Sequence, residues 1–137
     1  MQEYQGSIQQ EEQSRYERGW KRLEELDSQA GQRVIEALQD TAPDLASYII
    51  EFAFGDIHAR PGLDLKQRQL VIIATLVPQG DCEAQLELHI NAGLNVGLTA
   101  REIVEAIMQC APFTGFPRVF NALGVVKRVF ARRNIHA

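Results

Sequence analysis

Several side chains that could do chemistry lie close together in ten consecutive residues near the middle of the chain, Gly80–His89. This stretch contains a thiol (Cys82) and an imidazole (His89), with carboxylates and an amide between them. If Asp81 is the N-cap of a helix that runs to about Ala92, residues three, four and seven apart lie on one face of it. The residues on that face are Cys82, Gln85, Leu86 and His89. Apolar segments on both sides predict that the face is turned inward, where an imidazole needs a hydrogen-bond partner or a function.

The elements that must position this stretch are predicted to be helices, because apolar residues recur every three or four positions along most of the chain. The predicted helices cover residues 14–26, 30–38, 43–53, 65–77, 82–92, 100–110 and 116–132. The one strand-like stretch, Leu70–Ile73, lies inside a longer helical pattern. We therefore predict an all-α fold, with a single multi-helix domain over residues 15–133 and a flexible N-terminal tail over residues 1–14.

Local signals mark the ends of several of these helices. Pro43 suits a first helical turn, and Asp64 is a typical N-cap. Thr99 and Glu102 have the spacing of a capping box. Gly55 and Arg60-Pro61-Gly62 are predicted to break the helix that begins at Pro43. In the last helix, the residues predicted to face the core are Phe120, Leu123, Val126, Val129 and Phe130.

Composition and charge argue against several classes of protein. The chain has 137 residues, of which 45% are hydrophobic, and this suffices for one core. A net charge of −4 gives no electrostatic reason to expect nucleic acid or an anionic membrane as partner. The longest runs without Asp, Glu, Lys, Arg or His have twelve residues, too few for a bilayer span of about 20. The first ten residues lack the basic start and apolar middle of a signal peptide, so we expect a cytoplasmic protein.

Two further patterns bear on assembly and on metal binding. The predicted helices are apolar around most of their circumference at residues 70–77 and 103–108. A chain of this length would struggle to cover both surfaces, so we expect a homo-oligomer. Cys82 and Cys110 lie 28 positions apart and match neither a metal-site spacing nor a disulfide framework.

Five segments together resemble the carboxymuconolactone decarboxylase family. They are Arg15–Gly19, Phe54–Leu70, Gly80–Asn95, Leu98–Ile107 and Gly115–Leu123, so that the resemblance covers about residues 15 to 131. The resemblance implies an all-helical fold that works without a cofactor and assembles into homotrimers or homohexamers. It also implies one of two chemistries. The decarboxylase branch of the family removes CO2 from 4-carboxymuconolactone in aromatic degradation, whereas the alkyl hydroperoxidase D branch is a thiol peroxidase.

The peroxidase branch uses a Cys-x-x-Cys motif, a following histidine and a glutamate in the preceding helix. His89 matches the histidine and Cys82 matches the first cysteine, but Gln85 stands at the second cysteine and Gln69 at the glutamate. A glutamine can neither form a disulfide nor ionise as a relay. Cys110 could resolve Cys82 only if the fold brought their Cα atoms within about 7 Å. The resemblance therefore favours the decarboxylase branch.

Decarboxylation requires a cation that orients a carboxylate, and an acid that delivers a proton to carbon. We predict His89 as the proton donor, with Glu83 or Glu87 setting its tautomer, and Cys82 beside them in the catalytic group. His58 stands where the family commonly has Trp or Tyr, and we predict that it contacts the substrate. The candidate carboxylate-binding residues, in segments that carry the resemblance, are Arg60, Arg68 and Arg118.

The sequence leaves alternatives open. One is a thiol peroxidase that uses Cys82 alone and is reduced by an outside thiol; another is a non-catalytic helical oligomer. Metal binding is a weaker alternative, since the spacing of the possible ligands matches no known site pattern. The function that we predict is a cofactor-independent lyase acting on a small carboxylated lactone or related acid, with no nucleic-acid or membrane partner.

Overall fold

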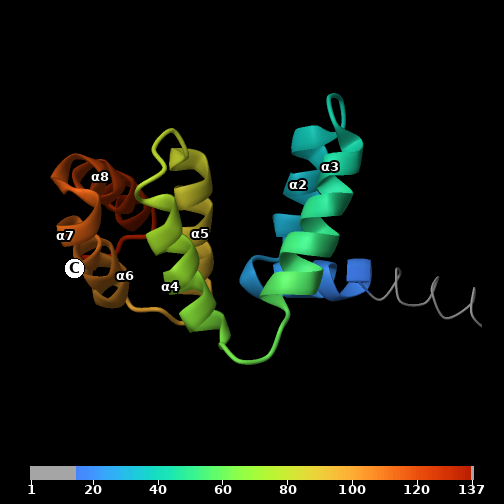
Figure 1. The fold of residues 1–137 in the computed structure, drawn as a ribbon, viewed down its shortest axis with the longest axis horizontal. Coiled ribbons are helices and arrows are strands. Elements are labelled where there is room, and N and C mark those ends of the chain that lie inside the picture. Colours follow the sequence, from blue (N-terminus) through green and yellow to red (C-terminus); the bar gives the residue numbers. More distant parts are fainter. Residues whose placement is uncertain (1–14, 137) are drawn as a thin grey trace, which may run out of the picture. The chain divides into compact units, whose positions relative to one another are not determined.

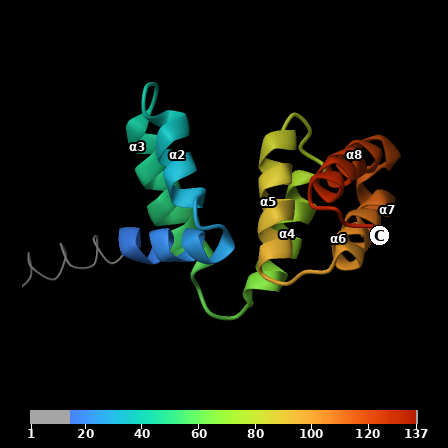
Figure 2. The same cartoon turned by 180° about the vertical axis from the view of Figure 1, so that it is seen from behind.

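The computed structural model describes residues 15–136, and all regular structure in that range is helical (Figures 1 and 2). The chain divides into two compact units, and the boundary between them in the sequence lies between Gly62 and Leu63. The predicted all-α fold is confirmed for these residues, including Leu70–Ile73, which is helical. The predicted tail, residues 1–14, lies outside the described residues. No helix in residues 15–136 is long and apolar enough to cross a membrane.

The first unit contains a helical segment over residues 15–26, followed by α2, α3 and a π-helix, η1. The bounds are Ala30–Leu38 for α2, Pro43–Tyr48 for α3 and Ile49–His58 for η1. The second unit contains α4 (Leu65–Leu76), α5 (Glu83–Asn95), α6 (Ala100–Gln109), α7 (Ala111–Thr114) and α8 (Phe116–Arg132). Predicted bounds are confirmed at both ends for α2 and α8.

The predicted caps of α4 and α6 are both present. Asp64 accepts a hydrogen bond from the backbone N–H of Gln67, whose side chain in turn accepts one from the N–H of Asp64. Thr99 and Glu102 exchange the same two bonds at the start of α6. These reciprocal bonds satisfy N–H groups that would otherwise lack partners at a helix start, which fixes where each helix begins.

The prediction that Gly55 ends a helix is wrong, because η1 continues through it to His58. Gly55 is buried, and a Cβ atom there would overlap the carbonyl oxygen of Arg15. A Cβ at Gly19 would likewise overlap the carbonyl oxygen of Ile50. The two glycines therefore mark where the helix over residues 15–26 and η1 pack backbone against backbone, a contact that leaves no room for side chains.

Ion pairs join the same two helices. Arg15 donates to both carboxylate oxygens of Asp56, from Nε at 2.9 Å and from Nη2 at 2.8 Å. Arg18 donates from Nε to the carbonyl oxygen of Gly55 at 3.1 Å, and its Nη2 lies 3.6 Å from Asp56. The hydrogen bond from Arg15 holds the pKa of Asp56 below its ordinary value of 3.8. A single carboxylate in η1 thus pairs with two arginines of the crossing helix.

We expect Asp56→Asn to lower stability at pH 7 but not in strong acid. Because the folded-state pKa is depressed, the stabilisation is complete above 3.8 and is lost as the pH falls through the folded-state pKa. The urea midpoints of wild type and variant should therefore converge as the pH falls below 3.8. Asp40→Asn is the control, since Asp40 is exposed and has no ion pair within residues 15–136. A difference that stays constant with pH would contradict the prediction.

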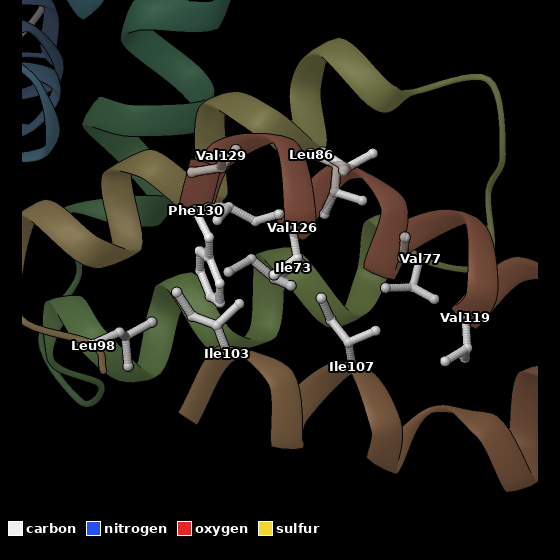
Figure 3. Packing of buried hydrophobic residues seen from close by; sticks show 13 residues of the cluster. Ile73, Val77, Leu86, Leu98, Ile103, Ile107, Val119, Val126, Val129 and Phe130 are labelled. Carbon is white, nitrogen blue, oxygen red and sulfur yellow. The ribbon is translucent and has the colours of Figure 1, made fainter. Parts of the chain in front are cut away.

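The core of the second unit holds together the helices that carry the candidate site. In Figure 3, Ile73 of α4, Leu86 of α5, Ile103 of α6 and Val129 of α8 meet in one apolar cluster. Each of these side chains is almost fully buried. Because α4, α5 and α8 all insert residues into this cluster, polar groups on their adjoining faces are held in fixed register.

One residue predicted to face this core does not do so: Phe120 is 79% exposed. Val126, Val129 and Phe130 are buried as predicted, and Leu123 is half-buried. The buried stripe begins at Val119, and successive residues of a helix are rotated by about 100°. Phe120 therefore points away from the stripe, and it joins an exposed apolar set with Met108, Phe113 and Phe116.

Candidate functional site

Helix α5, which carries most of the predicted catalytic residues, begins after a tight loop. The predicted N-cap, Asp81, is wrong: the cap is Cys82, and its side chain makes no capping bond. Gly80 and Asp81 both have positive φ angles, 68° and 52°, so the chain turns sharply before the helix can start. The Sγ atom of Cys82 donates to the carbonyl oxygen of Leu76, at 3.2 Å, which ties the two ends of the loop together.

The predicted inward face of α5 is present in part. Leu86 is buried, and Cys82 and His89 are half-buried, but Gln85 is exposed. Leu86 and Ile90 define the centre of the buried stripe, and Gln85 lies about 100° away from it. The thiol and the imidazole therefore lie at the margin of the core, where one side of each can meet solvent or a ligand.

A pocket of about 90 Å³ lies at the start of α5. It is lined by Leu76, Val77, Gly80, Asp81, Cys82, Glu83, Leu86, Arg118, Asn121, Ala122 and Val125. Three of the predicted site residues, Cys82, Glu83 and Arg118, thus share one cavity. Its wall combines apolar side chains with polar ones, which are two carboxylates, a thiol, an amide and a guanidinium. Asn121, one turn after Arg118 on α8, was not predicted.

Arg118 is positioned by the backbone at Gly80. A Cβ atom at Gly80 would overlap Nη1 of Arg118, so the guanidinium rests where a side chain would otherwise be. Arg118 lies in the first turn of α8, a position that the helix dipole disfavours for a cation. No hydrogen bond or ion pair joins it to another of residues 15–136. A guanidinium that makes no such bond within the described residues is suited to bind an anionic ligand such as a carboxylate.

His89 is bound through its ring by a residue of the neighbouring helix. Its Nδ1 atom lies 3.3 Å from Nε2 of Gln69, a fully buried side chain on α4. We predicted Glu83 or Glu87 as the group that sets the tautomer of His89. The residue that contacts Nδ1 is Gln69, whereas Glu87 pairs with Arg132 of α8 and Glu83 lines the pocket. The sequence did contain a signal for this partner, because Gln69 is an uncharged polar residue within the apolar pattern of α4.

The other predicted substrate-binding residues lie outside the pocket lining. Arg68 is half-buried on α4, adjacent in sequence to Gln69. His58 belongs to the first unit, where it is 4% exposed and its ring stacks on Phe54 with 5.5 Å between centroids. Arg60 follows η1 in the same unit and is exposed. Within the second unit, the structure thus brings together Cys82, Glu83 and Arg118, and pairs His89 with Gln69.

The two cysteines have different surroundings. Both are free thiols. Cys82 lines the pocket, whereas Cys110 packs against the core with Sγ 3.4 Å from the carbonyl oxygen of Ala106. Burial raises the pKa of the Cys110 thiol above its ordinary 9.0. A thiol with a raised pKa carries less of the reactive thiolate, so Cys110 is poorly suited to resolve an oxidised Cys82. Within residues 15–136, no group of three or more His, Cys, Asp and Glu side chains could hold a metal ion.

These features define an all-α protein with a polar pocket at the start of its central helix and a histidine held two turns further along. Residues 43–128 match the Carboxymuconolactone decarboxylase family. The chain belongs to this family, as the sequence segments predicted.

Curated relatives include two decarboxylases. The chain is 35% identical over 120 residues to 4-carboxymuconolactone decarboxylase of Acinetobacter baylyi. The aligned residues cover 87% of this chain and 89% of that protein. It is 36% identical over 80 residues to nitrosuccinic acid decarboxylase of Metarhizium robertsii, covering 58% and 55% of the two chains. It is also 40% identical over 76 residues to peroxisomal protein 2 of Saccharomyces cerevisiae, covering 55% of this chain and 26% of that protein. Similarity to two named decarboxylases supports a decarboxylase-like role.

Proposed function

We propose that the protein is a cofactor-independent carboxy-lyase that acts on a small carboxylated lactone or a related acid. The observation that carries the proposal is the position of Arg118, held against Gly80 in the pocket lining, where it makes no ion pair or hydrogen bond with another of residues 15–136. A pocket of about 90 Å³ has room for a carboxylate group but not for a large ligand. The two decarboxylases among the relatives support the same reaction class.

The proposed reaction uses groups along one side of α5. Arg118 binds a substrate carboxylate by paired hydrogen bonds, with Glu83 and Asn121 beside it in the pocket. The C–C bond to the departing carboxylate breaks and CO2 leaves. The electron pair of that bond delocalises toward the lactone carbonyl. His89 delivers a proton to the carbon and regains one from water. His89 lies seven residues after Cys82, roughly 10 Å along the helix, so the substrate extends from Arg118 along α5 toward the imidazole.

The proposal includes the remaining predicted residues and the assembly. Arg68, Arg60 and His58 are retained in the proposal as substrate-binding candidates, as the sequence predicted. The protein is proposed to work as a homotrimer or homohexamer, with a small molecule as substrate. The exposed set of Met108, Phe113, Phe116 and Phe120 supports such an assembly, since three of these side chains are at least 79% exposed.

A second candidate function is supported by the place of Cys82 in the pocket. In that reaction the Cys82 thiolate would attack a hydroperoxide, giving an alcohol and a sulfenic acid that an outside thiol reduces. Gln85 has no thiol, and the half-buried Cys110, whose pKa is raised by burial, is poorly suited to act as a resolving thiol. Cys82→Ser separates the candidates, because it should leave decarboxylation largely unchanged and should abolish peroxide reduction.

Arg118→Met tests the proposed carboxylate site. Hydrogen bonds to a charged group are worth about 1.5–3 kcal/mol, so we expect KM for 4-carboxymuconolactone to rise roughly 10- to 100-fold. Arg118→Lys should recover part of the loss, because an ammonium keeps the charge but not the bidentate geometry.

Arg128→Met is the matched control, since Arg128 is exposed on the same helix and lies outside the pocket lining. Equal effects of Arg118→Met and Arg128→Met would contradict a specific site and would point to the general charge of α8.

A further inference from the structure

Gln69 is an unusual residue for its position. It lies on α4 one turn before Ile73, and both side chains have no exposed surface. A Cβ atom at Gly93 of α5 would lie 3.8 Å from Cβ of Gln69 and 3.7 Å from Ile73, so α4 and α5 approach closely there. An apolar side chain of similar volume would fill this space without burying an amide, which is costly unless the amide is hydrogen-bonded. The amide is therefore best explained by its partner, Nδ1 of His89.

The polarity of this hydrogen bond determines the state of the imidazole. The Nε2 atom of Gln69 faces Nδ1 of His89 at 3.3 Å, and an amide nitrogen can only donate. Nδ1 must then accept, so the neutral ring carries its proton on Nε2. The two ring nitrogens lie on opposite sides of the imidazole, and a ring bound at Nδ1 by a fully buried residue directs Nε2 away from Gln69.

We propose that Gln69 is a positioning residue that fixes His89 as the Nε2–H tautomer and confines its proton exchange to Nε2. The inference rests on the proposed function, and deepens it by naming the nitrogen that donates the proton to carbon. Gln69 does not touch the substrate; it acts through His89. A carboxylate at this position would have the opposite effect, because it can only accept and would place a proton on Nδ1.

The direct test is nitrogen NMR of the histidine ring in the full-length, 15N-labelled protein. The His89 signals are identified by their loss in His89→Asn. At a pH where the ring is neutral, we expect wild type to have a proton on Nε2 and none on Nδ1. In Gln69→Glu, we expect Nδ1 to be protonated.

Gln85→Glu is the matched control, since it adds the same charge one turn from His89 on the exposed side of α5. It should leave the wild-type tautomer unchanged. Nδ1 protonation in wild type, or the same ring state in wild type and Gln69→Glu, would overturn the inference.

Gln69→Leu separates positioning from a purely structural role. The exchange keeps the volume and removes the amide, so we expect unfolding midpoints close to wild type. With 4-carboxymuconolactone as the probe, kcat should fall about tenfold or more while KM changes less than about twofold, because a misdirected acid slows only the chemical step. A loss of stability with unchanged kcat would show a structural role. If wild type fails to turn over this probe, the proposed function fails and the NMR result still decides the tautomer.

Discussion

Replacing His89 with alanine is expected to abolish decarboxylation while leaving the fold intact. The variant lacks the imidazole that we propose as the proton donor, at the half-buried margin of α5. Positioned general acids contribute about 100- to 10,000-fold to a rate, so we expect kcat to fall at least about 100-fold. The loss should appear in kcat more than in KM, since Arg118 in the pocket would still bind the substrate carboxylate.

His89→Asn strengthens this test, because alanine leaves the buried amide of Gln69 without its ring partner. Asparagine places a polar atom close to the position of Nδ1, so it can keep the bond to Gln69 but cannot act as an acid. Circular dichroism should show the same helicity for wild type and both variants. His136→Ala, at an exposed site near the C-terminus, should retain full activity. Activity retained in His89→Asn would remove His89 from the reaction.

Replacing Gly19 with alanine is expected to unfold or strongly loosen the first unit. Alanine is favoured over glycine by about 1 kcal/mol inside a helix. Against this gain, the new methyl group would overlap the backbone carbonyl of Ile50 in η1. Forced overlaps in packed regions cost about 1–3 kcal/mol, and backbone can yield less than a flexible side chain, so the cost here should reach at least about 3 kcal/mol. The free-energy cost of the overlap therefore exceeds the gain that alanine brings in helix propensity.

Trp20 gives a local readout of this change, since it is the only tryptophan in the chain and follows Gly19 directly. The urea midpoint from Trp20 fluorescence should fall sharply in Gly19→Ala. Gly124→Ala is the matched control in α8, where a new Cβ would meet nothing within 4 Å. It should stabilise the protein by about 0.5–1 kcal/mol. A stabilised Gly19→Ala would mean that the two helices do not cross as closely as described.

The sequence predicted helices well where their ends are set by local chemistry. The capping boxes at Asp64 and Thr99 need only residues three apart, so they can be found without knowledge of the tertiary fold. Gly55 could not be interpreted correctly in this way. Its role is to admit the backbone at Arg15, forty residues earlier in the chain, and local sequence carries no signal of that contact.

The candidate site was predicted in its residue types but not in its pairings. Cys82, Glu83 and Arg118 were named from the sequence, and they line one pocket. The partner of His89 at Nδ1 was not predicted, because Gln69 was interpreted only as the loss of an ionisable group. A neutral amide can still orient an imidazole, and its burial on α4 depends on how α4 packs against α5, which the spacing along one helix does not determine.

If this chain is a decarboxylase, the wild-type protein should turn over 4-carboxymuconolactone, the substrate named for the relative from Acinetobacter baylyi. The reaction would be followed by ultraviolet absorbance together with the CO2 released, at enzyme concentrations far below substrate. We predict many turnovers per chain, with one CO2 for each substrate consumed and no added cofactor. Absence of CO2 release above the uncatalysed rate, from protein that is folded and helical, would contradict the assignment of this substrate and reaction.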